Sequence, residues 1–337
     1  MATATCLVHT APASVELRPV ELAPLQEGEL LIETLFSAIS PGTELRCLRG
    51  RQPGGATGPF VPGYAATGRI AAVGPGCRRQ VGETVYHGQG AGFLGGVASQ
   101  WGAHASHVVV AEAAVLDLPA GLDPAPASLA KIAAVAWHGL EKAAIKAGER
   151  VAVVGLGPIG QCSARLARER GARVVAFDLV ASRVETAMAA GVDAVQVGAT
   201  LVDAARRRGW PETDFDVIID VTGVPQLIDS IAELAREPAP WHAPLRPGSR
   251  YLIQGSYTAQ AAFDYQKAFL KELTFFVPRD NTRADLEEVL AQMARGRLVV
   301  SDLFEAPVSP REAPGIYGGM GKPGELRSTA VFDWAQL

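Results

Sequence analysis

Cysteine is scarce in this chain of 337 residues, which contains only Cys6, Cys47, Cys77 and Cys162. No two of them form a Cys-X-X-Cys pair, and a framework of disulfide bonds is excluded at so low a count. We therefore expect all four to be reduced thiols, of which most are buried.

Long apolar runs and blocks of one charge are also missing. Lys, Glu or Arg interrupts every apolar stretch well before the roughly 18 residues that a membrane-spanning helix needs. The first residues, MATATCLVHTAPASVEL, lack the basic and apolar regions of a signal peptide. The formal charge is −4, with acids and bases mixed along the chain. We therefore expect a cytoplasmic protein that binds neither nucleic acid nor a membrane.

The length and the texture of the sequence indicate two domains. Up to about residue 125, short apolar runs such as GELLIETLF and GRIAAVG are separated by Gly and Pro clusters, which is typical of a β-rich domain. From Pro124 to Lys146 the chain is alanine-rich and reads as helical. We expect a β-rich catalytic domain at 1–125 plus 297–337 and a nucleotide-binding domain at 126–296.

Strands and helices alternate after Gly148, and this alternation predicts a Rossmann-type, doubly wound parallel sheet of six strands in an α/β fold. The predicted strands are RVAVVG, RVVAF, AVQV, FDVIID, RYLIQG and TFFV. The predicted helices include LARERGA, SRVETAMAAG, TLVDAARRRG, QLIDSIAELA and RADLEEVLAQMARG. The tail from Leu298 is too short to stand alone, so we expect it to return to the β-rich domain.

Three stretches match the dinucleotide fingerprint G-X-G-X-X-G, beginning at Gly90, Gly155 and Gly319. Only the second, Gly155-Leu156-Gly157-Pro158-Ile159-Gly160, follows a buried strand and opens a helix. In such a turn the first glycine permits the sharp bend. The second lets the backbone approach the pyrophosphate, and the third lets the helix close onto the sheet.

An acidic residue, Asp178, ends the next predicted strand, 18 residues after Gly160. A carboxylate there would accept hydrogen bonds from the adenosine ribose and repel a 2′-phosphate, so the sequence favours NAD(H) over NADP(H). Arg183 is the one nearby cation that would soften this preference or flank the adenine. Asp178 has an alternative interpretation as the N-cap of the following helix. Further cofactor contacts are expected where later strands end, at Thr222, Gly223, Gln254 and Gly255.

The whole chain resembles the medium-chain dehydrogenase/reductase superfamily. The resemblance is carried by SAISPGTE (37–44), VPGYAATGRI (61–70) and AVAWHGLEKAAIKAGERVAVVGLGPIGQ (134–161). Together with FLGGVAS (93–99) and FDW (332–334), these motifs are most similar to the bacteriochlorophyllide dehydrogenase branch. The resemblance implies a GroES-like β-rich domain, a small-molecule alcohol or ketone as substrate, and a homodimer or tetramer.

The resemblance fails at the catalytic zinc site of the superfamily. The first Cys ligand precedes Gly-Thr-Asp in zinc-dependent members, but here Ser40-Pro41 precedes Gly42-Thr43-Glu44. The His ligand is replaced by Tyr64, and the second Cys aligns with Lys131. The four-cysteine structural zinc lobe is missing as well. Because a catalytic zinc needs three protein ligands, we expect no metal.

Without zinc, hydrogen-bond donors must polarise the substrate oxygen. Lys131 is the only charge in the predicted helix 125–137, so it is a candidate, although a lysine extending to the helix surface is equally consistent with the pattern. Thr43 aligns with the proton-relaying hydroxyl of zinc relatives, and Tyr64 stands at the lost histidine. Their alternative roles are turn capping and pocket packing. Arg46 is expected to reach the cofactor phosphates or ribose.

These observations predict a metal-free, NAD-dependent alcohol dehydrogenase that interconverts a secondary alcohol and a ketone, in a biosynthetic or secondary-metabolite pathway. One alternative is a zinc-free NAD(P)H-dependent reductase of activated double bonds or quinones. Another is a non-catalytic NAD-binding protein. The sequence leaves open the direction of the reaction and whether the substrate is a tetrapyrrole, a polyol, an amino sugar or another metabolite.

Overall fold

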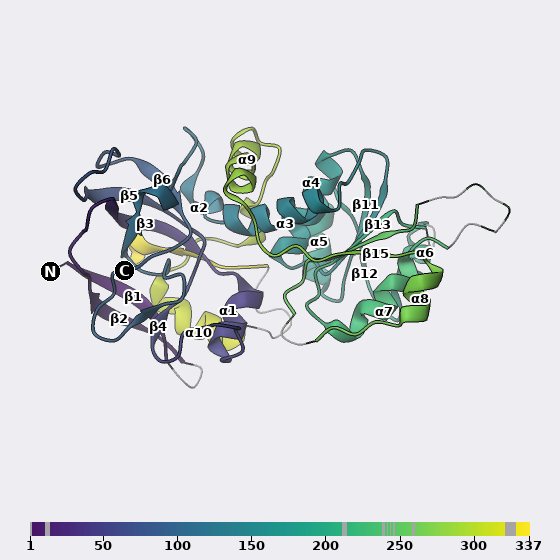
Figure 1. Ribbon diagram of the computed structural model, residues 1–337, viewed down its shortest axis with the longest axis horizontal. Helices are drawn as coiled ribbons and strands as arrows, with labels where there is room; N and C mark the ends of the chain where they lie inside the picture. Colours follow the sequence, from purple (N-terminus) through teal and green to yellow (C-terminus); the bar gives the residue numbers. More distant parts are fainter. Residues whose placement is uncertain are drawn as a thin grey trace. The chain divides into compact units, whose positions relative to one another are not determined.

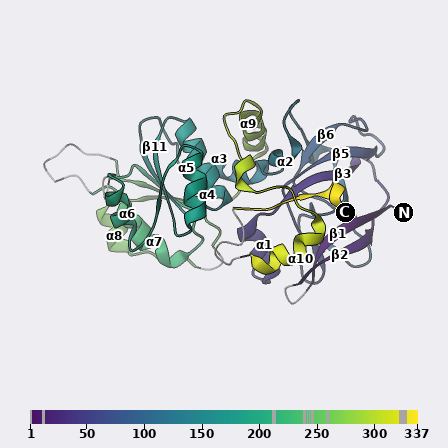
Figure 2. The same ribbon diagram turned by 180° about the vertical axis from the view of Figure 1, so that it is seen from behind.

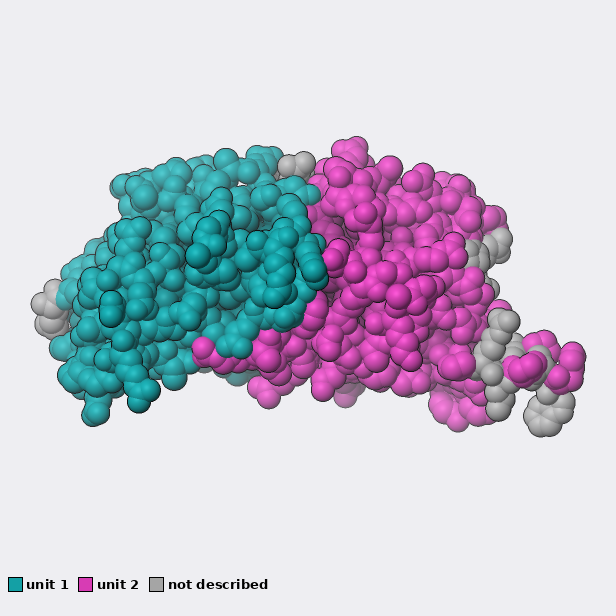
Figure 3. All heavy atoms as spheres, turned by 90° about the horizontal axis from the view of Figure 1, so that it is seen from above, with its two compact units in different colours: residues 1–132, 286–337 teal, residues 133–285 magenta. Residues whose placement is uncertain are grey.

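The computed structural model describes residues 2–10, 14–210, 214–237, 240, 242, 244, 247–257, 260–320 and 328–337. It divides into two compact units, which are Met1–Ile132 with Leu286–Leu337, and Ala133–Asp285 (Figure 3). The boundaries between the units thus fall after Ile132 and after Asp285, whereas they were expected from the sequence at 125/126 and 296/297. Helices α3 (Ala130–Lys142) and α9 (Arg283–Ala294) each contain one of the boundaries.

Unit 1 is built mainly from two β-sheets. One sheet has the strand order β2-β1-β4-β7, and the other has the order β16-β3-β5-β6-β9, with β8 pairing with β3. The strands are β1 (Thr3–Thr10), β2 (Ser14–Glu21), β3 (Glu29–Ala38), β4 (Phe60–Val61), β5 (Ala66–Val73), β6 (Thr84–His87), β7 (Ala98–Ser99), β8 (His107–Ala111), β9 (Leu116–Asp117) and β16 (Val331–Asp333). The sequence signalled β3, β5, β6 and β8, whereas the hairpin of β1 and β2 was not predicted.

Short helices complete unit 1. They are α1 (Pro41–Leu48), α2 (Pro124–Ala127), α10 (Ala313–Gly319) and the 3-10 helices η1 (Glu112–Ala114), η4 (Ser301–Leu303), η5 (Pro310–Glu312) and η6 (Trp334–Gln336). The core forms where alternate strand residues such as Leu30 and Ile32 point inward. Residues of the returning tail join a second cluster, in which Tyr317 and Phe332 pack with Leu7 and Ile39. The tail is thus part of the core of unit 1.

Unit 2 contains a six-stranded parallel sheet in the order β12-β11-β10-β13-β14-β15 (Figure 1). Its strands are β10 (Arg150–Val154), β11 (Arg173–Asp178), β12 (Asp193–Gln196), β13 (Val217–Asp220), β14 (Arg250–Ile253) and β15 (Thr274–Phe276). All six strands expected from the sequence are present. Because the strand order reverses at β10, the carboxyl ends of β10 and β13 lie beside each other, where ligands bind in such sheets.

Helices cover this sheet. They are α4 (Pro158–Glu169), α5 (Ala181–Ala189), α6 (Leu201–Arg207), η2 (Pro225–Leu227), α7 (Ile228–Ile231), η3 (Ala232–Leu234) and α8 (Tyr265–Leu270). Helix α4 packs on β10 and β11, and α5 packs on β11 and β12 (Figure 2). Residues of α6 and α7 share a buried cluster with strand residues such as Ala152 and Phe177. Both faces of the sheet are therefore apolar, which explains its continuous Val- and Ile-rich strands.

Two helix predictions require correction, and one helix was missed. The stretch 124–146 is not one helix, because it divides at Ser128–Leu129 and ends at Lys142; the Ser128 hydroxyl donates to the carbonyl of Ala125 over 2.6 Å. The predicted helix QLIDSIAELA is a succession of η2, α7 and η3. Helix α8 was not predicted, and Asp264 caps it through the backbone nitrogen of Lys267.

Candidate functional site

The turn after β10 has the backbone that a dinucleotide phosphate requires. Gly155 has φ +96°, a conformation that favours glycine. A Cβ atom at Gly160 would lie 1.8 Å from the Gly155 carbonyl oxygen, so the close approach of α4 to the turn depends on this glycine. At Gly157 an added Cβ would meet open space. Pro158 and Ile159 begin α4, whose N-terminus supplies a partial positive charge.

Asp178 lies at the carboxyl end of β11 and is connected to this turn. Its carboxylate accepts hydrogen bonds from the backbone nitrogens of Leu156 (2.6 Å) and Val180 (2.8 Å). The N-cap of α5 is Val180, so Asp178 does not cap that helix. A carboxylate has about four acceptor positions, which leaves capacity for two ribose hydroxyls. Arg183 Nη1 lies 3.8 Å from Asp178 Oδ2. The backbone carbonyl of Arg183 accepts a hydrogen bond from the Gln161 side chain.

The two further turns predicted from the sequence meet at the carboxyl ends of β13 and β14. An added Cβ at Gly255 would lie 2.5 Å from the backbone nitrogen of Gly223. The Thr222 hydroxyl donates to Asp220 over 2.7 Å. The side chain of Gln254 is engaged inside unit 2, since its Oε1 accepts from Ser163 and its Nε2 donates to Val135. The cofactor contact expected at Gln254 would therefore come from its backbone rather than from its side chain.

A buried carboxylate that sequence reasoning missed, Asp220, supports these turns. Besides Thr222, it accepts hydrogen bonds from the hydroxyls of Tyr251 (3.0 Å) and Tyr257. Burial and the neighbouring Asp220 carboxylate raise the pKa of Tyr251 and of Tyr257, so both remain hydroxyl donors at neutral pH. The signal was present in the sequence as an acid at the end of a predicted strand, as at Asp178.

In unit 1 the structure brings Tyr64 and Thr43 together, although 21 residues separate them. The Tyr64 hydroxyl lies 3.3 Å from Thr43 Oγ1 and is hydrogen-bonded to Ser40 Oγ. Arg46 Nη2 lies 3.4 Å from Thr43 Oγ1, and burial lowers the pKa of its guanidinium. We call Ser40, Thr43 and Tyr64 the hydroxyl cluster. Ser40 was not singled out in the sequence, because nothing there signals its contact with Tyr64.

Trp101 packs edge-to-face on Tyr64, with ring centroids 5.1 Å apart. Its backbone has φ +67°, a left-handed conformation that a bulky residue rarely adopts. A residue held in such a conformation stores strain, and strain of this kind is concentrated at functional sites. The aromatic ring is thus kept against the hydroxyl cluster at a conformational cost.

Lys131 comes from a different element. It is the second residue of α3 and is half-buried. The division between α2 and α3 places it in the first turn of a new helix rather than in the middle of a long one.

The residues at the three zinc-ligand positions expected from the resemblance are not of the types that usually bind zinc. Zinc in proteins takes thiolate, imidazole or carboxylate ligands. Where the resemblance places these ligands, the chain has Ser40-Pro41, Tyr64 and Lys131, none of which is one of these ligand types. Within the described part of the chain, no group of three or more His, Cys, Asp or Glu side chains is arranged to hold a metal ion. No described helix is both long and apolar enough to cross a membrane.

Family models match both units. The model described as "Zinc-binding dehydrogenase" matches residues 158–295, and "Alcohol dehydrogenase GroES-like domain" matches residues 26–120. A similar relative is the 2-desacetyl-2-hydroxyethyl bacteriochlorophyllide A dehydrogenase of Cereibacter sphaeroides, which is 26% identical over 98% of each chain.

Solved structures share the fold over almost the whole chain. A Sinorhizobium meliloti 1021 protein, provisionally assigned as a zinc-binding dehydrogenase and bound to NADP, has a TM-score of 0.82 at 20% identity, covering 99% of this chain and 100% of that one. Acetophenone reductase from Geotrichum candidum in complex with NAD has a TM-score of 0.81 at 19% identity, covering 98% and 97%. With its parallel sheet, glycine turn and β-rich unit, the chain therefore belongs to the medium-chain dehydrogenase/reductase superfamily of nicotinamide-dependent oxidoreductases.

Proposed function

We propose that the protein is a zinc-independent, NAD(H)-dependent alcohol dehydrogenase that interconverts a secondary alcohol and a ketone. The observation that carries this proposal is the hydroxyl cluster. The Tyr64 hydroxyl is hydrogen-bonded to Ser40 and to Thr43, in the two segments where the resemblance places metal ligands of zinc-dependent relatives. The donors that would polarise a substrate oxygen are therefore side chains of the protein itself.

A bound nicotinamide cofactor would supply the hydride chemistry, as acceptor from the carbinol carbon of an alcohol or as donor to a ketone. Its pyrophosphate would be held by the backbone of Gly155, Gly157 and Gly160 and by the N-terminus of α4. Asp178 would bind the adenosine ribose hydroxyls, and this supports NAD(H) over NADP(H). Arg183 would flank the adenine, and Arg46 the phosphates or ribose. The turns at Thr222–Gly223 and Gln254–Gly255 would contribute backbone contacts.

The remaining chemistry is the movement of one proton. In ketone reduction, the Tyr64 hydroxyl would donate a hydrogen bond to the carbonyl oxygen, and the Lys131 ammonium would stabilise the negative charge that develops there. As the hydride reaches the carbonyl carbon, the oxygen gains a proton from these donors. Thr43 lies 3.3 Å from the Tyr64 hydroxyl, so it is placed to relay a proton from solvent to Tyr64. In alcohol oxidation the proton travels the other way.

The relative in Cereibacter sphaeroides supports a secondary alcohol as substrate, because its name specifies a hydroxyethyl group on a bacteriochlorophyllide. A biosynthetic or secondary-metabolite role would be consistent with such a substrate.

The test is an assay of chelator-treated protein. With NAD⁺ and a panel of secondary alcohols, turnover should persist while plasma mass spectrometry finds no stoichiometric zinc. Tyr64→Phe should lower the turnover number about 10²-fold, as expected for a lost donor, whereas the exposed Tyr265→Phe should not. About one zinc per chain that survives chelation would refute the metal-free mechanism. If the protein reduces activated double bonds and uses only NADPH, the reductase alternative would be favoured. If it binds NADH but turns over no substrate, the non-catalytic alternative would be favoured.

A further inference from the structure

Two turns of unit 1 carry the hydroxyl cluster, and one buried pair of side chains connects them. Ser40 and Thr43 lie on the turn that begins α1, and Tyr64 follows Gly63 on the turn after β4. Glu44 and His104 are both fully buried, and Glu44 Oε2 lies 3.1 Å from His104 Nε2. Glu44 contacts the first turn and His104 contacts the second.

Glu44 leaves the Ser40 hydroxyl available for Tyr64. Ser40 occupies the N-cap position of α1, where a serine ordinarily uses its oxygen to accept a hydrogen bond from the helix. Here it makes no such bond. Instead, Glu44 Oε1 accepts the Ser40 backbone N–H over 2.8 Å, while Ser40 Oγ bonds the Tyr64 hydroxyl. The carboxylate thus fixes the Ser40 backbone in the position from which its side chain reaches Tyr64.

His104 holds the second turn. Gly63 has φ +96°, and a Cβ atom there would lie 2.6 Å from the His104 ring, so the ring rests directly against the Gly63 backbone. The backbone nitrogen of His104 donates to Pro62 over 3.0 Å, and that of Ala103 donates to Gly63 over 2.9 Å. The position of Tyr64 therefore depends on where the His104 ring lies.

The hydrogen bonds around the pair form one consistent set. Trp334 Nε1 donates to Ser37 Oγ, whose hydroxyl can in turn donate to His104 Nδ1, and both distances are 2.8 Å. In that arrangement His104 Nε2 carries the ring proton and donates to Glu44. Tyr317 donates to the same carboxylate. Burial alone would raise the pKa of Glu44, but His104, Tyr317 and the Ser40 nitrogen outweigh it and lower that pKa.

We infer that Glu44 and His104 form a positioning pair that sets the separation between Tyr64 and the hydroxyls of Ser40 and Thr43. The inference rests on the proposed function of Tyr64 for its catalytic consequence, but not for the structural link itself. Neither Glu44 nor His104 touches the reacting atoms in this scheme. Each acts through the turn that it holds.

The first experiment is a double-mutant cycle on turnover. Glu44→Gln keeps an acceptor for the Ser40 nitrogen but presents an amide to His104 and Tyr317. It should lower the turnover number about 10-fold or more, with the NADH dissociation constant unchanged. In a Tyr64→Phe background the same change should have less than about a 2-fold effect, because coupled residues are not additive. Glu112→Gln, a carboxylate of unit 1 that binds the backbone nitrogens of Arg78 and Arg79, is the matched control and should behave like the parent. Equal losses in both backgrounds would overturn the inference.

The second experiment compares two substitutions of His104, which also decide the question if Glu44→Gln does not fold. His104→Gln retains a donor toward Glu44 and should restore much of the turnover that His104→Leu loses. Urea unfolding of Tyr64→Phe, each His104 variant and the combinations measures the link without any activity. Additive unfolding free energies would show that the pair does not position Tyr64. If Tyr64→Phe itself leaves turnover intact, the proposed function fails, while coupling in unfolding still supports the positioning pair.

Discussion

Asp178 Oδ2 accepts a hydrogen bond from the backbone nitrogen of Leu156, and the two atoms lie 2.6 Å apart. The residue expected to recognise the ribose therefore also holds the turn expected to bind the pyrophosphate. In the proposed site, a single carboxylate would couple the two ends of the bound adenosine diphosphate. Substitution of Asp178 should consequently affect cofactor choice and cofactor affinity together.

NADH should bind more tightly than NADPH, by an amount on the order of 2–3 kcal/mol, because a 2′-phosphate would approach the Asp178 carboxylate. Fluorescence titration of the two cofactors measures the difference. In Asp178→Asn the difference should shrink, since the repelling charge is removed while a backbone acceptor is retained. Equal affinity of the parent protein for both cofactors would mean that Arg183, 3.8 Å from the carboxylate, neutralises it.

Lys131→Met should lower the turnover number about 10²–10³-fold, which is the usual loss when a donor to a developing oxyanion is deleted. NADH affinity should stay nearly unchanged, because the glycine turn and Asp178, rather than Lys131, are expected to hold the cofactor. Lys131→Arg should not restore full activity, since a guanidinium differs in reach and does not release its proton. Stopped-flow and steady-state assays measure these effects.

The matched control is Lys142→Met, which removes an exposed ammonium from the last turn of the same helix. It should leave turnover unchanged. If Lys131→Met instead retains near-normal turnover and only the melting temperature changes, Lys131 supports the fold and Tyr64 and Thr43 remain as the proton-transfer residues.

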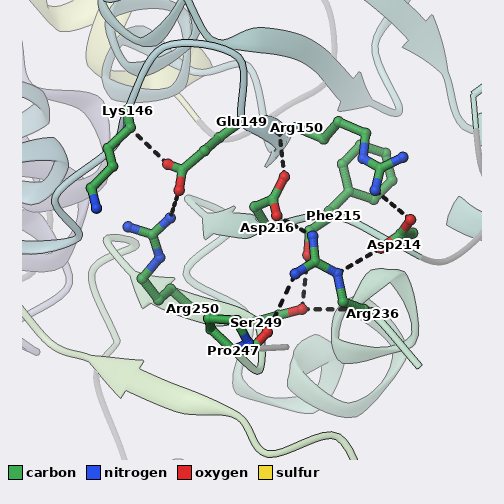
Figure 4. A network of polar contacts seen from close by, with 10 residues as sticks. All are labelled: Lys146, Glu149, Arg150, Asp214, Phe215, Asp216, Arg236, Pro247, Ser249 and Arg250. Atoms are coloured by element: carbon green, nitrogen blue, oxygen red, sulfur yellow. Dashed lines mark hydrogen bonds and ion pairs between the residues drawn. The ribbon is translucent and has the colours of Figure 1, made fainter. Parts of the chain in front are cut away.

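Arg236 joins Asp214 and Asp216 in the network of Figure 4, and its Nε lies 2.6 Å from Asp214 Oδ1. Burial would raise the pKa of Asp214, but Arg236 and Arg150 outweigh it and lower that pKa. A carboxylate whose pKa is lowered in the folded state stabilises the fold at pH values above its ordinary pKa, which is near 4. This contribution to stability is lost as the pH falls through the folded-state pKa. Arg236→Met should therefore reduce the unfolding free energy by about 2 kcal/mol at pH 7 and by less near pH 3.

Urea unfolding at the two pH values tests this expectation. Arg206→Met is its control, because the exposed Arg206–Asp203 pair should contribute less than about 1 kcal/mol. A loss for Arg236→Met that is the same at both pH values would show that the side chain acts by packing and not through its charge.

We expect a homodimer, as the resemblance implied, formed through unit 2. Strand β15 lies at the end of the described sheet order. Exposed apolar side chains lie on both sides of it in the sequence, with Phe269 64% and Val277 72% exposed. An edge strand beside such a patch is suited to pairing. Val277→Lys should shift the mass found by light scattering toward one chain, whereas Val299→Lys, at an exposed position of unit 1, should not. A parent protein that is monomeric at micromolar concentration would contradict the expectation.

Most of the elements of unit 2 could be predicted from the sequence, because the sequence patterns that indicate them are local. A Val-rich strand, three glycines and an acid 18 residues later specify one turn, and the turn is present. The contacts that support the hydroxyl cluster could not be predicted from the sequence, because the residues that make them are far apart along the chain. Glu44 lies 60 residues from His104 and 273 from Tyr317, and no periodicity reports such a meeting. The break after α2 was missed for a different reason, since one serine hydroxyl competes there with an otherwise continuous helical pattern.

Gly160 has a consequence for how mutational surveys of this protein would be interpreted. A methyl group at this position would overlap the Gly155 carbonyl oxygen at 1.8 Å. Every substitution would force α4 away from the strand that precedes it, and binding of NADH would be lost for that reason alone. Position 160 would then rank among the most intolerant in the chain, although its side of the helix faces the protein backbone and not a ligand. Intolerance to substitution measures how closely two segments approach, and it does not by itself identify a ligand contact.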